Sequence, residues 1–412
     1  MEAIDYLYFG IYYVMLFSST LWLLMFFSNR KKLLKSSKVN DKPSITFLIP
    51  AFNESKNIKK CINSVLNLNY PKEKIDIIVI NDGSTDRTKK ICEEFEMKGL
   101  IKLVNQKNSG KASALNRALK FVKTGLIATL DADSYVTKDY LDGMLKNLDE
   151  DVVAVTPSTK IIKNRTFSEK LQWVEYLFMI FLRKMFDFLG CQYVIPGVGS
   201  IIRMSFLKET GGFNENSIVE DTEIGFRCQY NRVKIKNSIN SIVYTEAPGT
   251  IKQLYKQRIR WYRGYFQHVF ENKEMILNPK FGTFGAFLIP FNFVWLFILA
   301  IMMFDISYRV LSSLFNWFYN YSLIGWDLFY IPLKLDLSLI MFNINVYMIF
   351  TFIFASVSIL TVYVSLKCSS ERVGLRSKKI NYILFLFVYP VFISIMWLSS
   401  LLHEIMKRKR TW

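Results

Sequence analysis

The sequence predicts an α/β domain with a mostly parallel sheet, joined to an α-helical transmembrane region. Two observations indicate this. Between about residues 43 and 264, short apolar runs alternate with segments in which apolar residues recur every three or four positions, the pattern of strands alternating with helices. On both sides lie apolar segments long enough to cross a bilayer core of about 30 Å at about 1.5 Å per helical residue.

The first membrane segment, residues 6–27, contains no charged residue. Signal peptides usually have an apolar stretch of only about 7–15 residues behind a basic start, whereas Glu2 and Asp5 precede this one, so we expect a retained transmembrane helix over 1–28. A basic cluster follows directly: Arg30, Lys31, Lys32, Lys35 and Lys38. Because basic residues beside a span favour the cytoplasmic side, we expect residues 29–42 to be a cytoplasmic linker and the α/β domain to be cytoplasmic.

Within the α/β region, the expected strands are 44–50, 75–80, 101–104 and 126–130, and helical spacing covers 53–66, 88–95 and 112–122. Ligands of open parallel sheets bind at the carboxyl ends of strands. Polar side chains lie just past three of these ends, in Asn53-Glu54, Asn81-Asp82 and Asp131-Ala132-Asp133. These residues are therefore candidates for a binding site.

Charge, cysteine and histidine content exclude several kinds of site. The formal net charge of +19 could indicate nucleic acid. However, much of the positive charge lies at 30–38, 372–379 and 407–410, beside apolar spans, where topology and lipid headgroups account for it. We therefore expect membrane lipids as partners and no nucleic acid. The five cysteines are scattered without paired spacing, which predicts reduced thiols, and two histidines are too few for a histidine-based metal site.

Six short motifs occur in a fixed order: Pro50-Ala51-Phe52-Asn53-Glu54, Asn81-Asp82-Gly83-Ser84, Gly110-Lys111-Ala112, Asp131-Ala132-Asp133, Glu220-Asp221 and Gln257-Arg258-Ile259-Arg260-Trp261. Each is weak alone. Together they resemble the membrane-embedded family 2 glycosyltransferases, the branch that includes cellulose, hyaluronan, chitin and poly-N-acetylglucosamine synthases. The resemblance covers nearly the whole chain. It implies a Rossmann-like GT-A catalytic domain over residues 43–264 that transfers a hexosyl unit from a UDP-sugar.

The resemblance assigns the donor side of the site. Asp82, with Glu54 nearby, would contact the uridine through charge-assisted hydrogen bonds, although Asp-Gly is also common in ordinary turns. Asp131 and Asp133 are spaced so that a strand would project both to one side, and their oxygens suit Mg²⁺ or Mn²⁺. A solvated strand end or a helix cap is the alternative for this pair. Lys111, at a helix start, would contact the diphosphate, or is simply a solvated lysine.

The acceptor side depends on the second half of the region. The resemblance assigns Asp221 as the general base, supported by Glu220, and no histidine lies nearby in the sequence to compete for this role. An ordinary helix start with acidic first-turn residues is the alternative. The glycine-bearing segment around Gly197 and Gly199 resembles the family's acceptor side, where missing side chains would leave room for a sugar.

The Gln257-Arg258-Ile259-Arg260-Trp261 motif distinguishes this branch of the family. In a helix, Gln257, Arg260 and Trp261 share one face. Arg260 would stabilise the leaving diphosphate, Trp261 would stack on an acceptor sugar, and Gln257 with Arg258 would help to bind the donor. The alternative is an interfacial helix whose arginines meet lipid headgroups and whose tryptophan lies in the aromatic belt.

The remaining chain reads as membrane-associated. An amphipathic surface helix is expected over 265–282, and a transmembrane region over 283–412 with spans at about 283–304, 338–366 and 380–402. Residues 305–337 are expected to form an external interfacial loop, and 171–189 an amphipathic helix that docks the catalytic domain on the membrane. Three C-terminal spans would leave basic residues 407–410 outside, against the positive-inside tendency; an extra span or a re-entrant segment would resolve this.

The resemblance implies an inverting, processive enzyme of the plasma membrane that makes a β-linked extracellular polysaccharide, with UDP-N-acetylglucosamine as the first candidate donor. Its cofactor would be Mg²⁺ or Mn²⁺, and an accessory membrane subunit is a possible partner. Two alternatives stay open. One is single transfer to a lipid, because ceramide glucosyltransferase-like relatives share the Q-x-x-R-W motif. The other is a catalytically silent membrane subunit, which the intact aspartates and Arg260 argue against.

Overall fold

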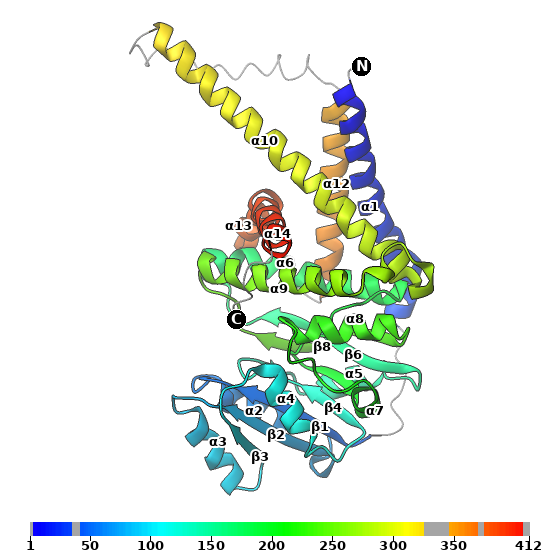
Figure 1. Ribbon diagram of the computed structural model, residues 1–412, viewed down its shortest axis with the longest axis vertical. Coiled ribbons are helices and arrows are strands. Elements are labelled where there is room, and N and C mark those ends of the chain that lie inside the picture. The colour runs from blue at the N-terminus through cyan, green and yellow to red at the C-terminus, as the bar shows by residue number, and fades with distance from the viewer. Residues whose placement is uncertain (1–2, 35–41, 325–345, 370–374, 407–412) are drawn as a thin grey trace.

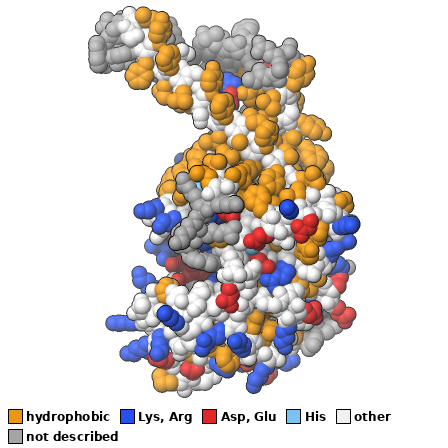
Figure 2. Space-filling model, viewed as in Figure 1, with side chains coloured by type: hydrophobic (Ala, Val, Ile, Leu, Met, Phe, Trp, Pro, Cys, Tyr) orange, Lys and Arg blue, Asp and Glu red, His pale blue; other side chains and the backbone are white. Residues whose placement is uncertain are grey.

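The computed structural model describes residues 3–34, 42–324, 346–369 and 375–406. Figure 1 shows a sheet domain in the lower half and long helices rising from its upper side, with helices α6 and α9 lying across the boundary between them. In Figure 2 hydrophobic side chains gather over the upper part and charged side chains over the sheet domain. The predicted combination of an α/β domain and an apolar helical region is therefore confirmed.

The domain is built on one eight-stranded sheet in the order β3-β2-β1-β4-β7-β6-β8-β5. The strands are β1 (Ile45–Ala51), β2 (Ile75–Asp82), β3 (Lys102–Gln106), β4 (Leu126–Thr129), β5 (Tyr135–Val136), β6 (Val152–Ile161), β7 (Ser200–Arg203) and β8 (Lys234–Thr245). Strands β1 to β4 pair in parallel, as do β6 and β8. Only β7 and β5 introduce antiparallel pairs among the described strands, so the predicted mostly parallel sheet is confirmed.

Helices cover both faces of this sheet, which explains why β1 reads as a continuous apolar run. Phe47 and Ile49 pack with α2 (Ile58–Leu66), α3 (Thr88–Met97) and α5 (Tyr140–Leu145). Leu48 points to the other face, where α4 (Lys111–Leu119), α7 (Met204–Glu209) and α8 (Glu220–Tyr230) contribute to the core. The helix predicted to open at Asn53 begins later, at Ile58, because Asn53 has φ of 56° and lies in a turn.

Helices α6 (Phe167–Leu189) and α9 (Ile251–Glu271) connect the sheet domain to the long helices. Each begins with a capping box, which satisfies two backbone N–H groups at its start. Apolar residues of α6 pack against α1 and α12. The amphipathic docking helix predicted around 171–189 is thus present, and it contacts the apolar helices directly.

Within the described part of the chain, four helices are long and apolar enough to cross a membrane: Asp5–Lys31, Phe284–Tyr319, Met348–Cys368 and Lys379–Ile405. They correspond to α1 (Ala3–Leu34), α10 (Ile289–Ile324), α12 (Val346–Cys368), and α13 (Leu375–Ile383) continuing into α14 (Tyr389–Ile405). Short π-helical segments, η4 (Phe284–Leu288) and η6 (Leu384–Val388), precede α10 and α14. All four spans match segments expected from hydropathy, although the expected residues 338–345 lie outside the described chain.

Two predicted elements in the tail are wrong. The separate surface helix over 265–282 is absent, because residues 265–271 continue α9 and are followed by short 3₁₀ turns, η2 (Lys273–Met275) and η3 (Pro279–Phe281). The external loop predicted from 305 is helical as far as Ile324. The two charged residues of this helical part pair with each other, since Arg309 Nε lies 2.9 Å from Asp305 Oδ2 one turn away on α10. The rest of that loop, 325–337, lies outside the described residues.

Candidate active site

A cleft of about 260 Å³ opens at the carboxyl ends of the central parallel strands. Its lining comes from three strand ends and two helices: Pro50, Ala51, Phe52, Glu54, Asp82, Lys111, Asp131, Ala132, Asp133 and Arg260. The structure therefore brings together six residues that the sequence predicted for the site. They come from positions 54 to 260 of the chain and meet because parallel strands end at the same edge of the sheet.

Asp82, the last residue of β2, anchors the loop that leads to α4. Its Oδ1 accepts hydrogen bonds from Gln106 Nε2 at 2.8 Å and from the Ser109 N–H at 2.9 Å, and its Oδ2 accepts one from the Gly110 N–H at 3.0 Å. The backbone N–H groups at the start of α4 therefore already bind an anion, the carboxylate of Asp82. Since a carboxylate offers about four acceptor positions, Asp82 retains about one for a ligand.

Lys111 is held between two carboxylates rather than solvated. Its Nζ lies 2.6 Å from Asp131 Oδ1 and 2.9 Å from Glu220 Oε1. Burial would lower the pKa of this amine, but the charges of Asp131 and Glu220 hold it above its ordinary value. Because an ammonium has three donors, one N–H stays available to an anion in the cleft. The solvated-lysine alternative is therefore wrong.

Asp131 and Asp133 both face the cleft, but not by strand alternation. Strand β4 ends at Thr129, and the two aspartates lie in the turn that follows. Asp133 Oδ1 accepts a hydrogen bond from the Ser134 hydroxyl at 2.7 Å. Burial, reinforced by the neighbouring Asp131 charge, raises the pKa of Asp133 to about 6. A buried carboxyl beside a second one is chemically suited to a cation.

The protein supplies only part of the ligand set that a divalent metal ion requires. The described residues contain no group of three or more His, Cys, Asp or Glu that could hold a metal ion. Mg²⁺ characteristically takes one or two carboxylates and completes its shell with water and substrate phosphates. Asp131 and Asp133 match that pattern, with one oxygen of Asp131 shared with Lys111. The residues present therefore fit a metal that arrives with a phosphorylated ligand.

Glu220 and Asp221 open helix α8 and have opposite pKa shifts. Burial raises the pKa of Asp221 to about 6, with a further rise from the Glu220 charge. Burial would also raise the pKa of Glu220, but Lys111 lowers it below its ordinary value. Arg260 lowers the pKa of both carboxyls, which places its charge near them. Asp221 is thus a carboxylate that can take up a proton near neutral pH.

The motif residues on helix α9 lie in two environments, the cleft and the protein interior. Arg260 lines the cleft, whereas Arg258 is fully buried and pairs with Glu175 of α6, with its Nη2 atom 2.5 Å from Glu175 Oε2. The predicted donor contact of Arg258 is therefore wrong in this structure. Gln257 and Trp261 do not line the cleft; each contacts the Arg258 guanidinium instead. The sequence pattern could not separate the two arginines, because either fits a helix facing anions.

The two glycines expected to make room for a sugar also leave room for neighbouring protein atoms. A Cβ at Gly197 would lie 2.4 Å from Lys111 Nζ and would disrupt the bridge to Asp131. Gly199 has φ of 80°, and a Cβ there would lie 2.8 Å from Val243 Cγ2. Gly197 thus permits the Lys111 contacts and Gly199 permits close packing behind them, while their acceptor role stays a prediction.

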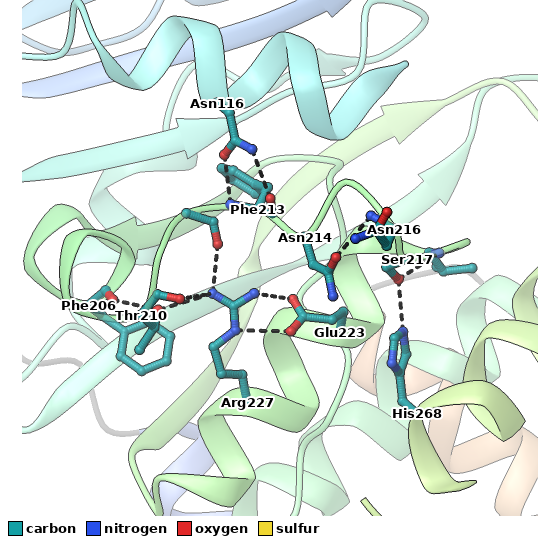
Figure 3. A network of polar contacts seen from close by, with 12 residues as sticks. Asn116, Phe206, Thr210, Phe213, Asn214, Asn216, Ser217, Glu223, Arg227 and His268 are labelled. Atoms are coloured by element: carbon teal, nitrogen blue, oxygen red, sulfur yellow. Dashed lines mark hydrogen bonds and ion pairs between the residues drawn. The ribbon is translucent and has the colours of Figure 1, made fainter. Parts of the chain in front are cut away.

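A polar network that the sequence did not reveal holds the segment before Asp221 against α9 (Figure 3). Ser217 Oγ lies 2.9 Å from His268 Nε2 and accepts a hydrogen bond from the Val219 N–H at 3.1 Å. Val219 also packs against Gly264, where a Cβ would lie 2.5 Å from Val219 Cγ2. Since Arg260 lies on the same helix, α9 sets the position of Asp221 relative to Arg260.

The same network fastens this segment to α4 and α8. In Figure 3 the Asn116 side chain brackets the Phe213 backbone, accepting from its N–H and donating to its C=O, both at 2.8 Å. Arg227 pairs with Glu223 and donates to the carbonyl oxygens of Thr210 and Gly212. A single serine, histidine or glycine has no sequence signature for such a role, because its partners lie far along the chain.

Comparison with known proteins identifies relatives of this site. Residues 46–211 match Glycosyl transferase family 2. The poly-β-1,6-N-acetyl-D-glucosamine synthase of Staphylococcus epidermidis is 32% identical over 240 residues, which cover 57% of this chain and 58% of that protein. The enzyme of the same name from Staphylococcus aureus strain COL is 31% identical over 249 residues, covering 60% and 58%. The chain thus matches less than two thirds of the length of these relatives.

A solved structure supports the fold over almost the whole chain. The mannosyltransferase PcManGT from Pyrobaculum calidifontis, solved in complex with GDP-Man and Mn²⁺, superposes with a TM-score of 0.60. The superposition covers 97% of this chain and 99% of that one, at 15% sequence identity. At this identity the likeness concerns the arrangement of the sheet domain and the long helices, and not the ligands.

Proposed function

We propose, from the match of residues 46–211 to Glycosyl transferase family 2, that the chain is an inverting, processive membrane glycosyltransferase. It transfers a hexosyl unit from a UDP-sugar to the hydroxyl of a growing β-linked polysaccharide. The observation that carries the proposal is the Lys111 bridge, which joins Asp131 on the donor side to Glu220, the neighbour of Asp221, on the acceptor side. A displacement reaction requires the bound donor and the base that activates the acceptor hydroxyl to lie close together.

The donor occupies the cleft. Asp82 and Glu54 lie where strands β1 and β2 end and accept hydrogen bonds from the uridine. Asp131 and Asp133 would hold Mg²⁺ or Mn²⁺ together with the diphosphate, and the ion would supply Lewis-acid stabilisation of the departing phosphate. The remaining N–H of Lys111 and the guanidinium of Arg260 face the same space. They stabilise the negative charge that develops on the leaving UDP.

Asp221 removes the proton from the acceptor hydroxyl. Its pKa of about 6 leaves it ionised at neutral pH while still basic enough to accept a proton. The acceptor oxygen then attacks the anomeric carbon as the bond to UDP breaks. One base and one displacement give inversion without a covalent intermediate. Glu220 keeps Lys111 in place, and Trp261 offers a flat surface for the acceptor ring at the α9 end of the site.

UDP-N-acetylglucosamine is the first candidate donor, because the matched relatives are named as N-acetylglucosamine polymer synthases. The four apolar helices support a multi-pass position in the plasma membrane, with the sheet domain on the cytoplasmic side as the basic segment 30–38 favours. The long helices then lie next to the acceptor end of the site, where a polymer would leave. The acceptor is either the polysaccharide or, in single transfer, a lipid, and an accessory subunit would bind within the membrane region.

The test is to incubate membranes containing the full chain with individual radiolabelled UDP-sugars and to size the products. We expect high-molecular-weight material from UDP-N-acetylglucosamine, and we expect Trp261→Ala to lose elongation more severely than it loses UDP release. A short, organic-extractable glycolipid as the sole product would replace the polysaccharide with a lipid acceptor. Absence of UDP release from every donor would leave a catalytically silent subunit.

A further inference from the structure

Arg258 is the most deeply buried large polar side chain of α9, and it organises two neighbours. Its exposed fraction is 0%, its Nη2 donates to Glu175 Oε2 at 2.5 Å, and its Nη1 donates to Gln257 Oε1 at 2.6 Å. Its guanidinium carbon also lies 4.1 Å from the centre of the Trp261 ring. One planar cation therefore contacts both Gln257 and Trp261, the first and last residues of the motif that contains Arg260.

This arrangement depends on Glu175. Taking a guanidinium out of water is costly unless a carboxylate pairs with it, and Glu175 is the described carboxylate within ion-pair distance. Burial would lower the pKa of Arg258, but the Glu175 charge holds it well above its ordinary value. Without Glu175 the charge would have to leave the interior, and Gln257 and Trp261 would lose the group that fixes them.

Glu175 in turn belongs to the helix that docks on the apolar helices. Trp173, Val174 and Leu177 of α6 pack with Leu366 of α12, and Phe181 packs with Trp22 of α1. Arg258 and Glu175 therefore tie the orientation of Trp261 to α6, a helix that packs on the membrane helices α1 and α12 and also on strands β6 and β8. The sheet fixes the positions of the donor residues Asp82, Asp131 and Asp133, because they lie at or just after the ends of β2 and β4.

We infer that Glu175 is a positioning residue that acts through Arg258 to hold Trp261 for the acceptor chain, so that it controls elongation and not donor activation. This inference rests on the proposed function, in which Trp261 contacts the acceptor. The Glu175–Arg258 pair thus fixes the position of Trp261 between the donor residues at the strand ends and the membrane helices, where the polymer would leave.

The experiment compares Glu175→Gln with a matched control in full-length protein in membranes, using UDP-[¹⁴C]N-acetylglucosamine. Glu404→Gln is the control, because Glu404 of α14 also pairs with a buried arginine of α9, Arg263, with 3.3 Å between Glu404 Oε2 and Arg263 Nε. We expect Glu175→Gln to keep UDP release within about threefold of wild type while polymer formation falls at least tenfold. Glu404→Gln should leave the ratio of polymer to released UDP unchanged.

A double variant separates positioning from folding. Glu175→Met with Arg258→Met removes both charges, and such replacements of buried pairs often preserve stability, but no guanidinium remains over Trp261. We expect this protein to accumulate and still to show the tenfold elongation defect. Polymer formation at the wild-type ratio in either variant would overturn the inference alone. A wild-type chain that releases UDP but makes no polymer would overturn the proposed function, and the inference with it.

Discussion

The Nζ atom of Lys111 lies 2.9 Å from Oε1 of Glu220, although 109 positions separate the two residues in the sequence. Lys111 opens α4 and also contacts Asp131, while Glu220 opens α8 directly before Asp221. This contact joins the donor half of the cleft to the proposed base. It also gives the base a nearby positive charge, which has a measurable consequence.

Lys111→Met should move the acid limb of the pH–rate profile upward. Lys111 lowers the pKa of Asp221, so its removal lets burial and the Glu220 charge raise that pKa further above about 6. We also expect the transfer rate at neutral pH to fall by at least about tenfold, the effect of about 1.4 kcal/mol in the barrier. Lys89→Met, at an exposed pair with Glu93, is the control. An unchanged acid limb would contradict the bridge.

Transfer by the wild-type chain should decline as the pH falls through about 6. Only the ionised form of Asp221 accepts a proton, and its pKa is about 6, so the rate should be level above neutrality and drop about tenfold per unit well below the pKa. Asp221→Asn should lose roughly 10²–10⁴ in rate while binding of UDP-sugar, measured by titration calorimetry, changes little. A fully active Asn variant would exclude Asp221 as the base.

Chelation should abolish transfer, and Mn²⁺ or Mg²⁺ should restore it. Asp131 and Asp133 line the cleft and would supply carboxylate oxygens to the ion, which would then rely on the donor phosphates for further ligands. We therefore expect Mn²⁺ binding, followed by electron paramagnetic resonance, to tighten when UDP is added. Asp131→Asn and Asp133→Asn should remove that coupling, whereas Asp151→Asn, at an exposed surface pair with Lys234, should not. Full activity of metal-stripped protein would end the metal assignment.

Gly264→Ala should impair transfer without touching the cleft. The added methyl group would lie 2.5 Å from Val219 Cγ2 and would push the segment before Asp221 away from α9. Overpacking of this kind costs about 1–3 kcal/mol, so both the melting temperature and the rate should fall. Gly249→Ala, which meets open space, is the control. Adding Val219→Ala to Gly264→Ala should restore activity; failure to do so would exclude this contact as the cause.

Several features followed from the sequence because they depend on local patterns. The strands β1, β2, β3 and β4 were predicted within a few residues, since each is an apolar run closed by a turn. Asp82, Asp131 and Asp133 were placed at strand ends for the same reason, and parallel strands leave such residues only one edge to share. The four apolar helices were predicted from length and hydropathy, which the membrane requires of any spanning segment.

The roles of Arg258, Gly197 and His268 could not be predicted in this way. The sequence places Arg258 and Arg260 two positions apart in one motif, and only the position of α6 decides that one arginine is buried against Glu175 while the other faces the cleft. A side chain larger than that of glycine does not fit at Gly197, because Lys111 occupies the space that a Cβ would need. His268 meets Ser217 through a contact 51 positions away in the sequence.

By itself, then, the sequence determined the elements, the edge of the sheet where the aspartates gather, and the apolar helices. These depend on hydrophobic periodicity and chain direction, which are properties of neighbouring residues. The tertiary structure alone decided which charges pair: Lys111 with Asp131 and Glu220, and Arg258 with Glu175. A buried charge must find a partner wherever the fold brings one, and that partner can come from any part of the chain.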